Sequence, residues 1–308
     1  MNSEKKRHRI RGKEIWQYLF CLPFLICFLA FTVYPTLYSL NVSLNQWNGF
    51  TNMEFVGVKN YVQILTKDPL FWKSVVNTFI LMALSTPTTV FFGLLLAYVL
   101  YNLTRGKRFF QTTTFYPYVI TPVAIGFIFS YMFDWQTGLI NKLLTAAKIL
   151  DSPFYWLQNP IAIKLIISIM IIWRYLGYYI MMFLASMTSI SPEIYEAARV
   201  DGATSSQTFW KITVPVLRNS IFFLAITSVI GGLKMFEEPM LIFSGWGSAF
   251  AGAAGGPNNA ALTVMWKFYN DAYRLDTRVG YAAAESYVLF AIIMIITVIM
   301  FRVTREKD

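Results

Sequence analysis

The chain is poor in the side chains that carry out most enzyme chemistry. Its 308 residues include only two cysteines and one histidine. Cys21 and Cys27 stand six residues apart in one apolar stretch, so on a helix they lie on different turns and provide neither a disulfide framework nor a metal site. His8 lies in a basic tail, where a lone histidine is normally solvated. We therefore expect no catalytic residue and no bound metal, and we do not expect an enzyme.

A phosphate-binding loop is also missing. Neither GxxxxGKS nor GxxxxGKT occurs, and the glycine-rich run 252–256 is followed by Pro257 instead of a lysine and a helix. The chain is therefore not expected to bind ATP through that motif. If ATP drives its activity, the hydrolysis has to take place on separate subunits.

Charged residues are scarce, at 14% of the chain against about 25% in ordinary globular proteins. The hydrophobic class makes up 56%. This composition predicts an all-α integral membrane protein, because apolar stretches of about 20 residues cross a bilayer as helices. We expect one membrane domain at 16–302 between a basic tail at 1–15 and a short tail at 303–308. Six transmembrane helices are predicted within it, at about 16–40, 72–100, 107–133, 159–187, 218–243 and 280–302, with kinks marked by Pro23, Pro87, Pro117 and Pro122.

Lysine and arginine are distributed unevenly around these spans. The two tails and the loops at 101–110 and 188–218 carry 15 of them, whereas the loops at 41–71, 134–158 and 244–279 carry seven. Positively charged loops resist translocation, so both termini and the loop at 188–217 are expected in the cytoplasm. The chain is thus predicted to be a multi-pass protein of the bacterial cytoplasmic membrane.

The net charge of +10 has a simpler explanation than nucleic-acid binding. The basic residues cluster beside the membrane segments and do not form one stripe, so they are expected to contact lipid headgroups. No nucleic-acid partner is predicted.

The loop at 188–217 is a polar, amphipathic segment between two hydrophobic spans. Ser191, followed by proline and an acid, predicts a helix start that runs to about Ala198 or Arg199. Asp201 and Gly202 predict a turn.

A second short helix is predicted directly after that turn. Thr204 and Gln207 form a capping-box pattern that opens it, and Pro215 is expected to end or kink it. The predicted product is a compact elbow whose small residues let another protein approach.

The elbow carries a recognisable motif. It resembles EAAxxxG, nine residues, and then IxLP, the signature of permease subunits of binding-protein-dependent ABC importers, and departs from it only at Val214. Further stretches resemble the maltose-type, carbohydrate-uptake branch of that family: YPTLYSLNVSLNQWNGF, EIYEAARVDGATSSQTFWKITVPVL, GGPNNAALTVMWKFYNDAYR and VGYAAAESYVLF. The resemblance covers about residues 16–302. It places ATPase coupling at Glu196, Ala197, Ala198, Asp201, Gly202, Ile212 and Pro215.

The resemblance implies a full set of partners. These are a homologous second permease, two ATP-binding cassette ATPase subunits that hold ATP and Mg, and an extracytoplasmic sugar-binding protein. The implied function is that of the membrane-spanning subunit of an ATP-driven sugar importer, with an oligosaccharide as substrate. The permease would form half of the pathway.

Charged residues inside the predicted spans indicate where a substrate could pass, because each costs about 2.5–3.5 kcal/mol at a helix centre. Thr227, Gly231, Lys234 and Glu238 recur at helical spacing in the fifth span. Two interpretations stay open: an ion-pair network, in which Lys234 pairs with Glu238 and Arg174 with a glutamate, or a sugar pathway. Together with the sugar positions that the resemblance implies, the candidate pathway residues are Trp173, Arg174, Gly177, Tyr178, Lys234, Met235, Glu237 and Glu238.

Two other functions remain as alternatives. An ATP-independent secondary transporter would move protons through intramembrane acids such as Glu237. A membrane-embedded glycosyltransferase would need acids in its loops, but Asp271 and Asp276 are expected to be solvated. The intramembrane charges also keep a charged sugar, such as a uronate, open as a substrate. The apolar segment at 262–268, after the GGPNN turn, is expected to lie on the membrane or to enter the bundle.

Overall fold

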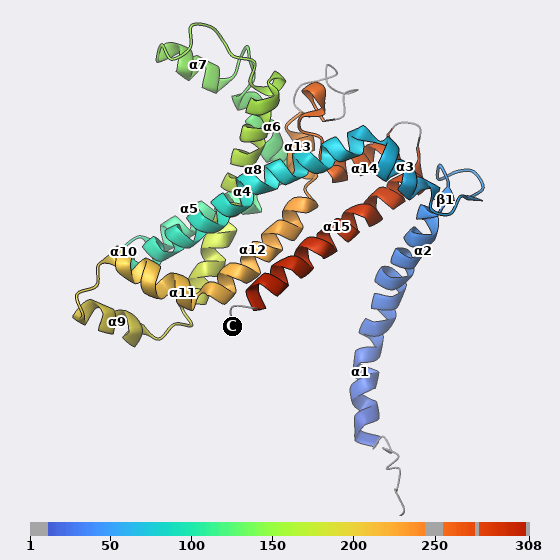
Figure 1. The fold of residues 1–308 in the computed structure, drawn as a ribbon. Helices are drawn as coiled ribbons and strands as arrows, with labels where there is room; N and C mark the ends of the chain where they lie inside the picture. The colour runs from blue at the N-terminus through green and yellow to red at the C-terminus, as the bar shows by residue number, and fades with distance from the viewer. Residues whose placement is uncertain (1–11, 244–254, 275–276, 306–308) are drawn as a thin grey trace, which may run out of the picture.

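The computed structural model describes residues 12–243, 255–274 and 277–305. The described part of the chain begins with a long helix that stands apart from the rest of the molecule (Figure 1). It consists of α1 (Gly12–Phe28), the π-helical turn η1 (Leu29–Val33) and α2 (Tyr34–Ser43). Its last part, α2, packs on the body, where Tyr287 donates a hydrogen bond to the carbonyl of Thr36 at 2.6 Å. The antiparallel strands β1 (Asn45–Gln46) and β2 (Glu54–Phe55) and the helix α3 (Lys59–Lys67) follow.

The centre of the bundle is the pair formed by α4 (Pro69–Asn102) and α8 (Pro160–Met187). Each helix starts with a capping side chain followed by proline, which suits the first turn. Asp68 accepts from the amide of Phe71, and Asn159 accepts from the amides of Ile161 and Ala162. The two helices approach closely at Gly93, where an added Cβ would lie 2.7 Å from the Cβ of Tyr179.

The helix predicted at 107–133 is instead two helices, α5 (Lys107–Val119) and α6 (Pro122–Met132), bent by 93°. The proline at 122 explains the break, because a residue before proline is forced out of the helical region. Thr121 accordingly has extended backbone angles, with φ −61° and ψ 139°. The kink predicted at Pro122 is therefore confirmed, and it is sharp enough to divide the span into two helices. The helix α7 (Leu139–Ala146) and the 3-10 turn η2 (Trp156–Gln158) lie between α6 and α8.

The helix predicted at 218–243 is also interrupted. It consists of α12 (Arg218–Leu233) and the short α13 (Glu237–Leu241), with residues 234–236 outside both helices. Pro239 gives the physical reason, because its missing N–H and its ring prevent a helical hydrogen bond to the carbonyl of Met235. The hydroxyl of Thr263 donates to that carbonyl instead, at 2.8 Å.

The loop between α8 and α12 forms the predicted elbow. It contains α9 (Pro192–Val200), α10 (Ser205–Thr208), the π-helical turn η3 (Phe209–Thr213) and α11 (Val214–Val216). In Figure 1 the elbow lies at one end of the bundle, near the end of α15, and α7 and α13 lie toward the other end. The remaining elements are the 3-10 turn η5 (Pro257–Asn259) and the helices α14 (Val264–Tyr273) and α15 (Val279–Arg305).

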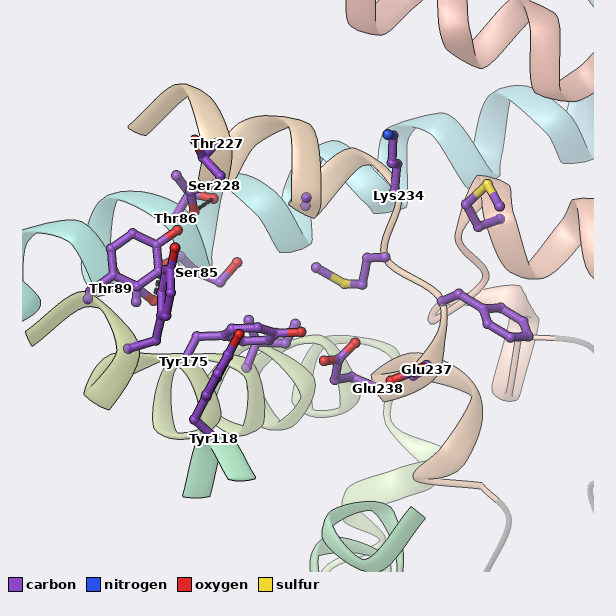
Figure 2. Close-up of a pocket in the computed structure, with 18 residues that line it drawn as sticks. Ser85, Thr86, Thr89, Tyr118, Tyr175, Thr227, Ser228, Lys234, Glu237 and Glu238 are labelled. Atoms are coloured by element: carbon purple, nitrogen blue, oxygen red, sulfur yellow. Dashed lines mark hydrogen bonds between the residues drawn. The ribbon is translucent and has the colours of Figure 1, made fainter. Parts of the chain in front are cut away.

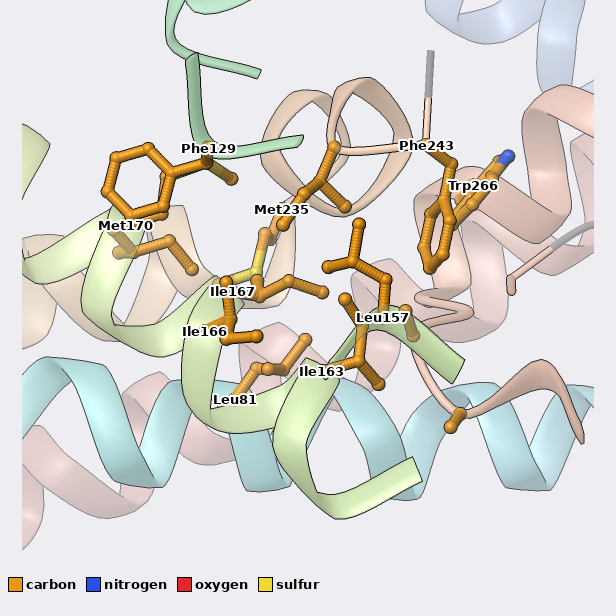
Figure 3. Packing of buried hydrophobic residues seen from close by; sticks show 14 of the residues in the cluster. Leu81, Phe129, Leu157, Ile163, Ile166, Ile167, Met170, Met235, Phe243 and Trp266 are labelled. Atoms are coloured by element: carbon orange, nitrogen blue, oxygen red, sulfur yellow. The ribbon is translucent and has the colours of Figure 1, made fainter. Parts of the chain in front are cut away.

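The apolar segment at 262–268 enters the bundle and does not lie on its surface. Leu262 and Val264 are almost completely buried, and so is Trp266. Leu262 and Trp266 belong to the core shown in Figure 3, together with residues of α4, α6 and α8. Val264 belongs to a second buried cluster with residues of α3, α4 and α15. The GGPNN turn that precedes the segment has positive φ at Gly255, Gly256, Asn258 and Asn259.

Four helices of the described residues are long and apolar enough to cross a membrane. The number rises to six if each of two bent pairs, α5 with α6 and residues 205–216 with α12, counts as one span. The protein is therefore mostly helical with several membrane-crossing segments.

Candidate functional site

A cavity of 620 Å³ lies between α4, α8 and the interrupted α12–α13 segment (Figure 2). Its volume falls within the range of about 300–1,000 Å³ that is typical of small-molecule pockets. Non-helical backbone in a membrane bundle is tolerated where it lines such a cavity, and residues 234–236 do so. The lining residues are Ser85, Thr86, Thr89, Tyr118, Ile171, Tyr175, Tyr178, Tyr179, Thr227, Ser228, Gly231, Gly232, Lys234, Met235, Phe236, Glu237, Glu238 and Met265.

One part of the cavity is lined by small hydroxyl groups. Ser85, Thr89 and Thr227 each donate their hydroxyl hydrogen to a carbonyl four residues earlier, at 2.7–2.9 Å. Ser228 donates to the hydroxyl of Thr86 at 3.1 Å, which joins α12 to α4. Because their hydrogens are occupied, the first three oxygens are available chiefly as acceptors. This wall suits a ligand that donates hydrogen bonds, such as a polyol.

Tyrosine rings also line the cavity. Tyr118 of α5 stacks on Tyr178 of α8 with ring centroids 5.2 Å apart, and it meets Tyr175 edge-on at 5.9 Å. Tyr178 in turn meets Tyr179 at 5.4 Å. Tyrosine combines an apolar ring with a polar tip, so this wall can cover the flat face of a sugar and also bond to its hydroxyls.

Carboxylates lie beside the tyrosines. Nη1 of Arg174 lies 2.6 Å from Oε1 of Glu238 and 3.6 Å from Oε2 of Glu237. Arg174 and Glu238 are buried, whereas the side chain of Glu237 is 54% exposed. Arg174 also lies over the ring of Tyr175, 5.1 Å from its centroid. The predicted pairing of Arg174 with a glutamate across the bundle is confirmed.

The predicted pairing of Lys234 with Glu238 was wrong. The helix ends at Leu233, so the two residues are not one turn apart on a helix. Within the described part of the chain Lys234 makes no ion pair, and Figure 2 shows its nitrogen directed away from Glu237 and Glu238.

Five of the eight predicted pathway residues line the cavity, and three do not. Tyr178, Lys234, Met235, Glu237 and Glu238 belong to the lining. Arg174 is not in the lining but pairs with Glu238, which is. Trp173 packs its ring on Phe129 at 5.8 Å, outside the lining. An added Cβ at Gly177 would lie 2.0 Å from the carbonyl oxygen of Thr114, so this glycine lets α5 and α8 approach.

The elbow has the local structure that its sequence predicted, with two differences. Gly202 has φ +75°, and the capping box between Thr204 and Gln207 is formed. The chain bends by 71° between residues 205–216 and α12, next to Pro215. However, Ser191 makes no capping hydrogen bond through its side chain. Ala198 is buried and so does not contribute to an open docking face.

The predicted coupling residues are otherwise open to a partner. Glu196, Ala197 and Asp201 are exposed, as is Pro215, and Ile212 is half-buried. An added Cβ at Gly202 would have no heavy atom within 4 Å. The loop therefore presents accessible backbone at its turn.

A buried cluster of charged side chains around Lys267 was not predicted from the sequence. Lys267 of α14 lies 2.9 Å from a carboxylate oxygen of Asp68 and 2.8 Å from one of Asp271, and it also pairs with Glu285 of α15. Asp271 in addition accepts from Arg278 at 2.6 Å. The expectation that Asp271 is a solvated loop charge was wrong, and Asp276 lies outside the described residues. The cluster joins the starts of α4 and α15 to α14.

The charges in this cluster change the ionisation of its members. Burial would raise the pKa of Asp68, but hydrogen bonds from Lys267, Tyr281 and the amide of Phe71 lower it below the ordinary 3.8. Burial would lower the pKa of Lys267, but the carboxylates of Glu285 and Asp271 raise it. Both groups are therefore charged at neutral pH. Within the described residues, no three His, Cys, Asp or Glu side chains are arranged to hold a metal ion.

Other cavity residues were missed although the sequence held a signal for some of them. Ser85 and Thr86 stand four and three residues before Thr89 in the second predicted span, spacings that place each of them on the same helix face as Thr89. Tyr118 and Tyr175 had no comparable signal, because aromatic residues occur throughout the spans.

Comparison with known proteins places the chain in a family. A family model described as "Binding-protein-dependent transport system inner membrane component" matches residues 71–305. The lactose transport system permease protein LacF of Rhizobium radiobacter is 35% identical over 307 residues, which cover 99% of this chain and 98% of LacF. The multiple sugar-binding transport system permease protein MsmF of Streptococcus mutans is 30% identical, over 96% of this chain and 97% of MsmF.

A solved structure shares the fold. One chain of a bacterial alginate ABC transporter, crystallised in complex with an alginate pentasaccharide-bound periplasmic protein, aligns with a TM-score of 0.81 at 22% identity, over 98% of both chains. The chain described here therefore belongs to the family of inner-membrane components of binding-protein-dependent transport systems, and it is a multi-pass permease and not an enzyme.

Proposed function

We propose that this permease forms half of the translocation pathway of an ATP-driven importer for a sugar, with an oligosaccharide as its cargo. The cavity between α4, α8 and α12 carries the proposal, because it combines a hydroxyl-lined wall with a wall of stacked tyrosines. Both features suit a sugar, which presents hydroxyl groups on its edges and apolar C–H faces. The names of LacF and MsmF support the same substrate class.

The proposed partners follow from the family. A homologous second permease would complete the pathway, two ATPase subunits would bind ATP and Mg, and an extracytoplasmic sugar-binding protein would deliver the cargo. The structural relative in complex with its periplasmic protein supports the last of these. Residues 16–302 would form a single membrane domain of six spans, with both termini and the elbow in the cytoplasm, as the distribution of lysine and arginine favours.

The elbow would couple the ATPase to the pathway. Closure of the ATPase dimer on ATP would push the exposed turn around Glu196 and Gly202, and the bend beside Pro215 would pass that movement directly to α12. Because α12 lines the cavity, its displacement would open the cavity to one side of the membrane. Resetting after hydrolysis would expose the sugar to the cytoplasm.

Purification of the chain from its native membrane in mild detergent, with mass spectrometry of the associated proteins, tests this assembly. We expect a second permease, an ATPase and an extracytoplasmic binding protein. A chain that purifies alone and transports in liposomes without ATP would contradict the proposal and favour a secondary transporter.

A further inference from the structure

The names of the relatives leave the charge of the cargo open, because lactose is neutral and alginate is a polymer of uronic acids. We infer that the cavity of this permease admits uncharged saccharides and rejects acidic ones, and that Glu237 is a residue that sets this preference. The inference rests on the proposed function, since it concerns the same cavity.

The cation beside the tyrosine wall, Arg174, is already paired with a carboxylate of the protein. Arg174 is the guanidinium that could have bound a cargo carboxylate, but it is buried and does not line the cavity. Its Nη1 lies 2.6 Å from Glu238 and 3.6 Å from Glu237, so two carboxylates of the protein already compensate its charge. An acidic sugar would have to displace Glu238 to reach it, which would leave a buried carboxylate without its partner.

Among the described residues, Lys234 is the one lysine or arginine in the cavity lining. Its nitrogen points away from the tyrosines and from both glutamates in Figure 2. It therefore does not neutralise the carboxylates beside which a sugar ring would stack. A cargo carboxylate on the tyrosine wall would face acids and not a cation.

Glu237 places a carboxylate in the cavity lining. Its side chain is 54% exposed and lines the cavity, and it lies 3.6 Å from an Arg174 that already pairs with Glu238. Two carboxylates thus share one guanidinium, which leaves an excess negative charge at the cavity wall. A carboxylate accepts hydrogen bonds strongly, so Glu237 can bind the hydroxyls of a neutral sugar, but it repels an anionic one.

The charge of the natural cargo tests the inference directly. The binding protein that copurifies with the importer is denatured, and the released ligand is identified by mass spectrometry. An uncharged saccharide supports the inference. A uronate or a sugar phosphate overturns it while leaving the sugar importer intact, whereas a ligand that is no saccharide removes the proposed function as well.

A matched variant tests the role of Glu237. Proteoliposomes with the complete importer take up the identified cargo, or a derivative in which one hydroxymethyl group is oxidised to a carboxylate. The Glu237→Gln substitution keeps size and hydrogen bonding but removes the charge. We expect it to lower the ratio of neutral to acidic uptake on the order of 5-fold, at unchanged protein abundance. Because the same binding protein serves both measurements, an unchanged ratio would overturn the role of Glu237.

Discussion

Arg174 of α8 donates a hydrogen bond to Glu238 of α13 over 2.6 Å, and both side chains are buried. The pair fixes α13 against α8 directly after the interruption of the fifth predicted span. It thereby holds the non-helical residues 234–236 in place as part of the cavity wall. Structural stability and pathway shape depend on the same two residues.

Breaking this pair should destabilise the protein strongly. Arg174→Gln leaves Glu238 buried without its cation, which costs roughly 3–5 kcal/mol. Glu238→Gln should cost less, because Arg174 keeps the more distant Glu237 at 3.6 Å. The double variant should cost much less than the sum of the two, because neither charge then remains. The test measures the fraction of protein that stays monodisperse after heating, for the wild type, the two single variants and the double variant. Additive losses would show that the two residues act independently.

Substitution at Gly202 should separate coupling from folding. Its φ of +75° favours glycine, and Asn and Asp tolerate this region about equally well, so Gly202→Asn is a matched control for Gly202→Asp. We expect both variants to insert into the membrane and Gly202→Asp to lose sugar uptake more severely, because it adds a negative charge to the docking surface. Sugar uptake and ATPase rates are measured for both variants and divided by protein abundance, so that a loss of coupling is distinguished from a loss of folded protein. Equal uptake by the two variants would count against a charge-sensitive contact.

Gly177, a predicted pathway residue, and Gly231, which lines the observed cavity, should respond differently when alanine adds a methyl group. A Cβ at Gly177 would lie 2.0 Å from the carbonyl oxygen of Thr114, whereas a Cβ at Gly231 would have open space. Gly177→Ala should therefore lose about 1–3 kcal/mol of stability through overpacking, and Gly231→Ala should not. Thermal unfolding in detergent compares them. A stable Gly177→Ala protein would mean that α5 and α8 are not in close contact.

Acid should weaken the cluster around Lys267. The pKa of Asp68 is lowered in the folded protein, so its contribution to stability is present above its ordinary pKa of 3.8 and is lost as the pH falls through the lowered value. Asp68→Asn can still cap α4 but cannot titrate. We expect the difference in melting temperature between wild type and this variant to be largest above about pH 4 and to shrink below it. A difference that is constant down to pH 2 would contradict the ion pair.

The sequence predicted much of this structure because hydropathy and capping patterns are local. The elbow is an example, since Thr204 and Gln207 form their capping box from neighbouring residues alone. The interruption at residues 234–236 was missed because Pro239 lies four residues after Met235, the residue whose helical hydrogen bond it removes. The relevant signal was present, but it was read as part of an apolar span.

Long-range pairing could not be predicted in the same way. Lys267 meets Asp68 and Glu285 from three separate segments of the chain, and only the fold brings them together. The same limit applies to Tyr118, which joins the cavity because α5 packs against α8. The pairing of Arg174 was easier to predict, because an arginine inside a span requires an acidic partner and the spans contain few acids.

Transport by the reconstituted complex tests the central claim most directly. The copurified complex is placed in liposomes, the binding protein is supplied outside with its labelled sugar, and ATP is enclosed inside. The account predicts sugar uptake that requires both ATP and the binding protein and that falls in the Gly202→Asp variant. Uptake by this chain alone, driven by a proton gradient without ATP, would contradict it.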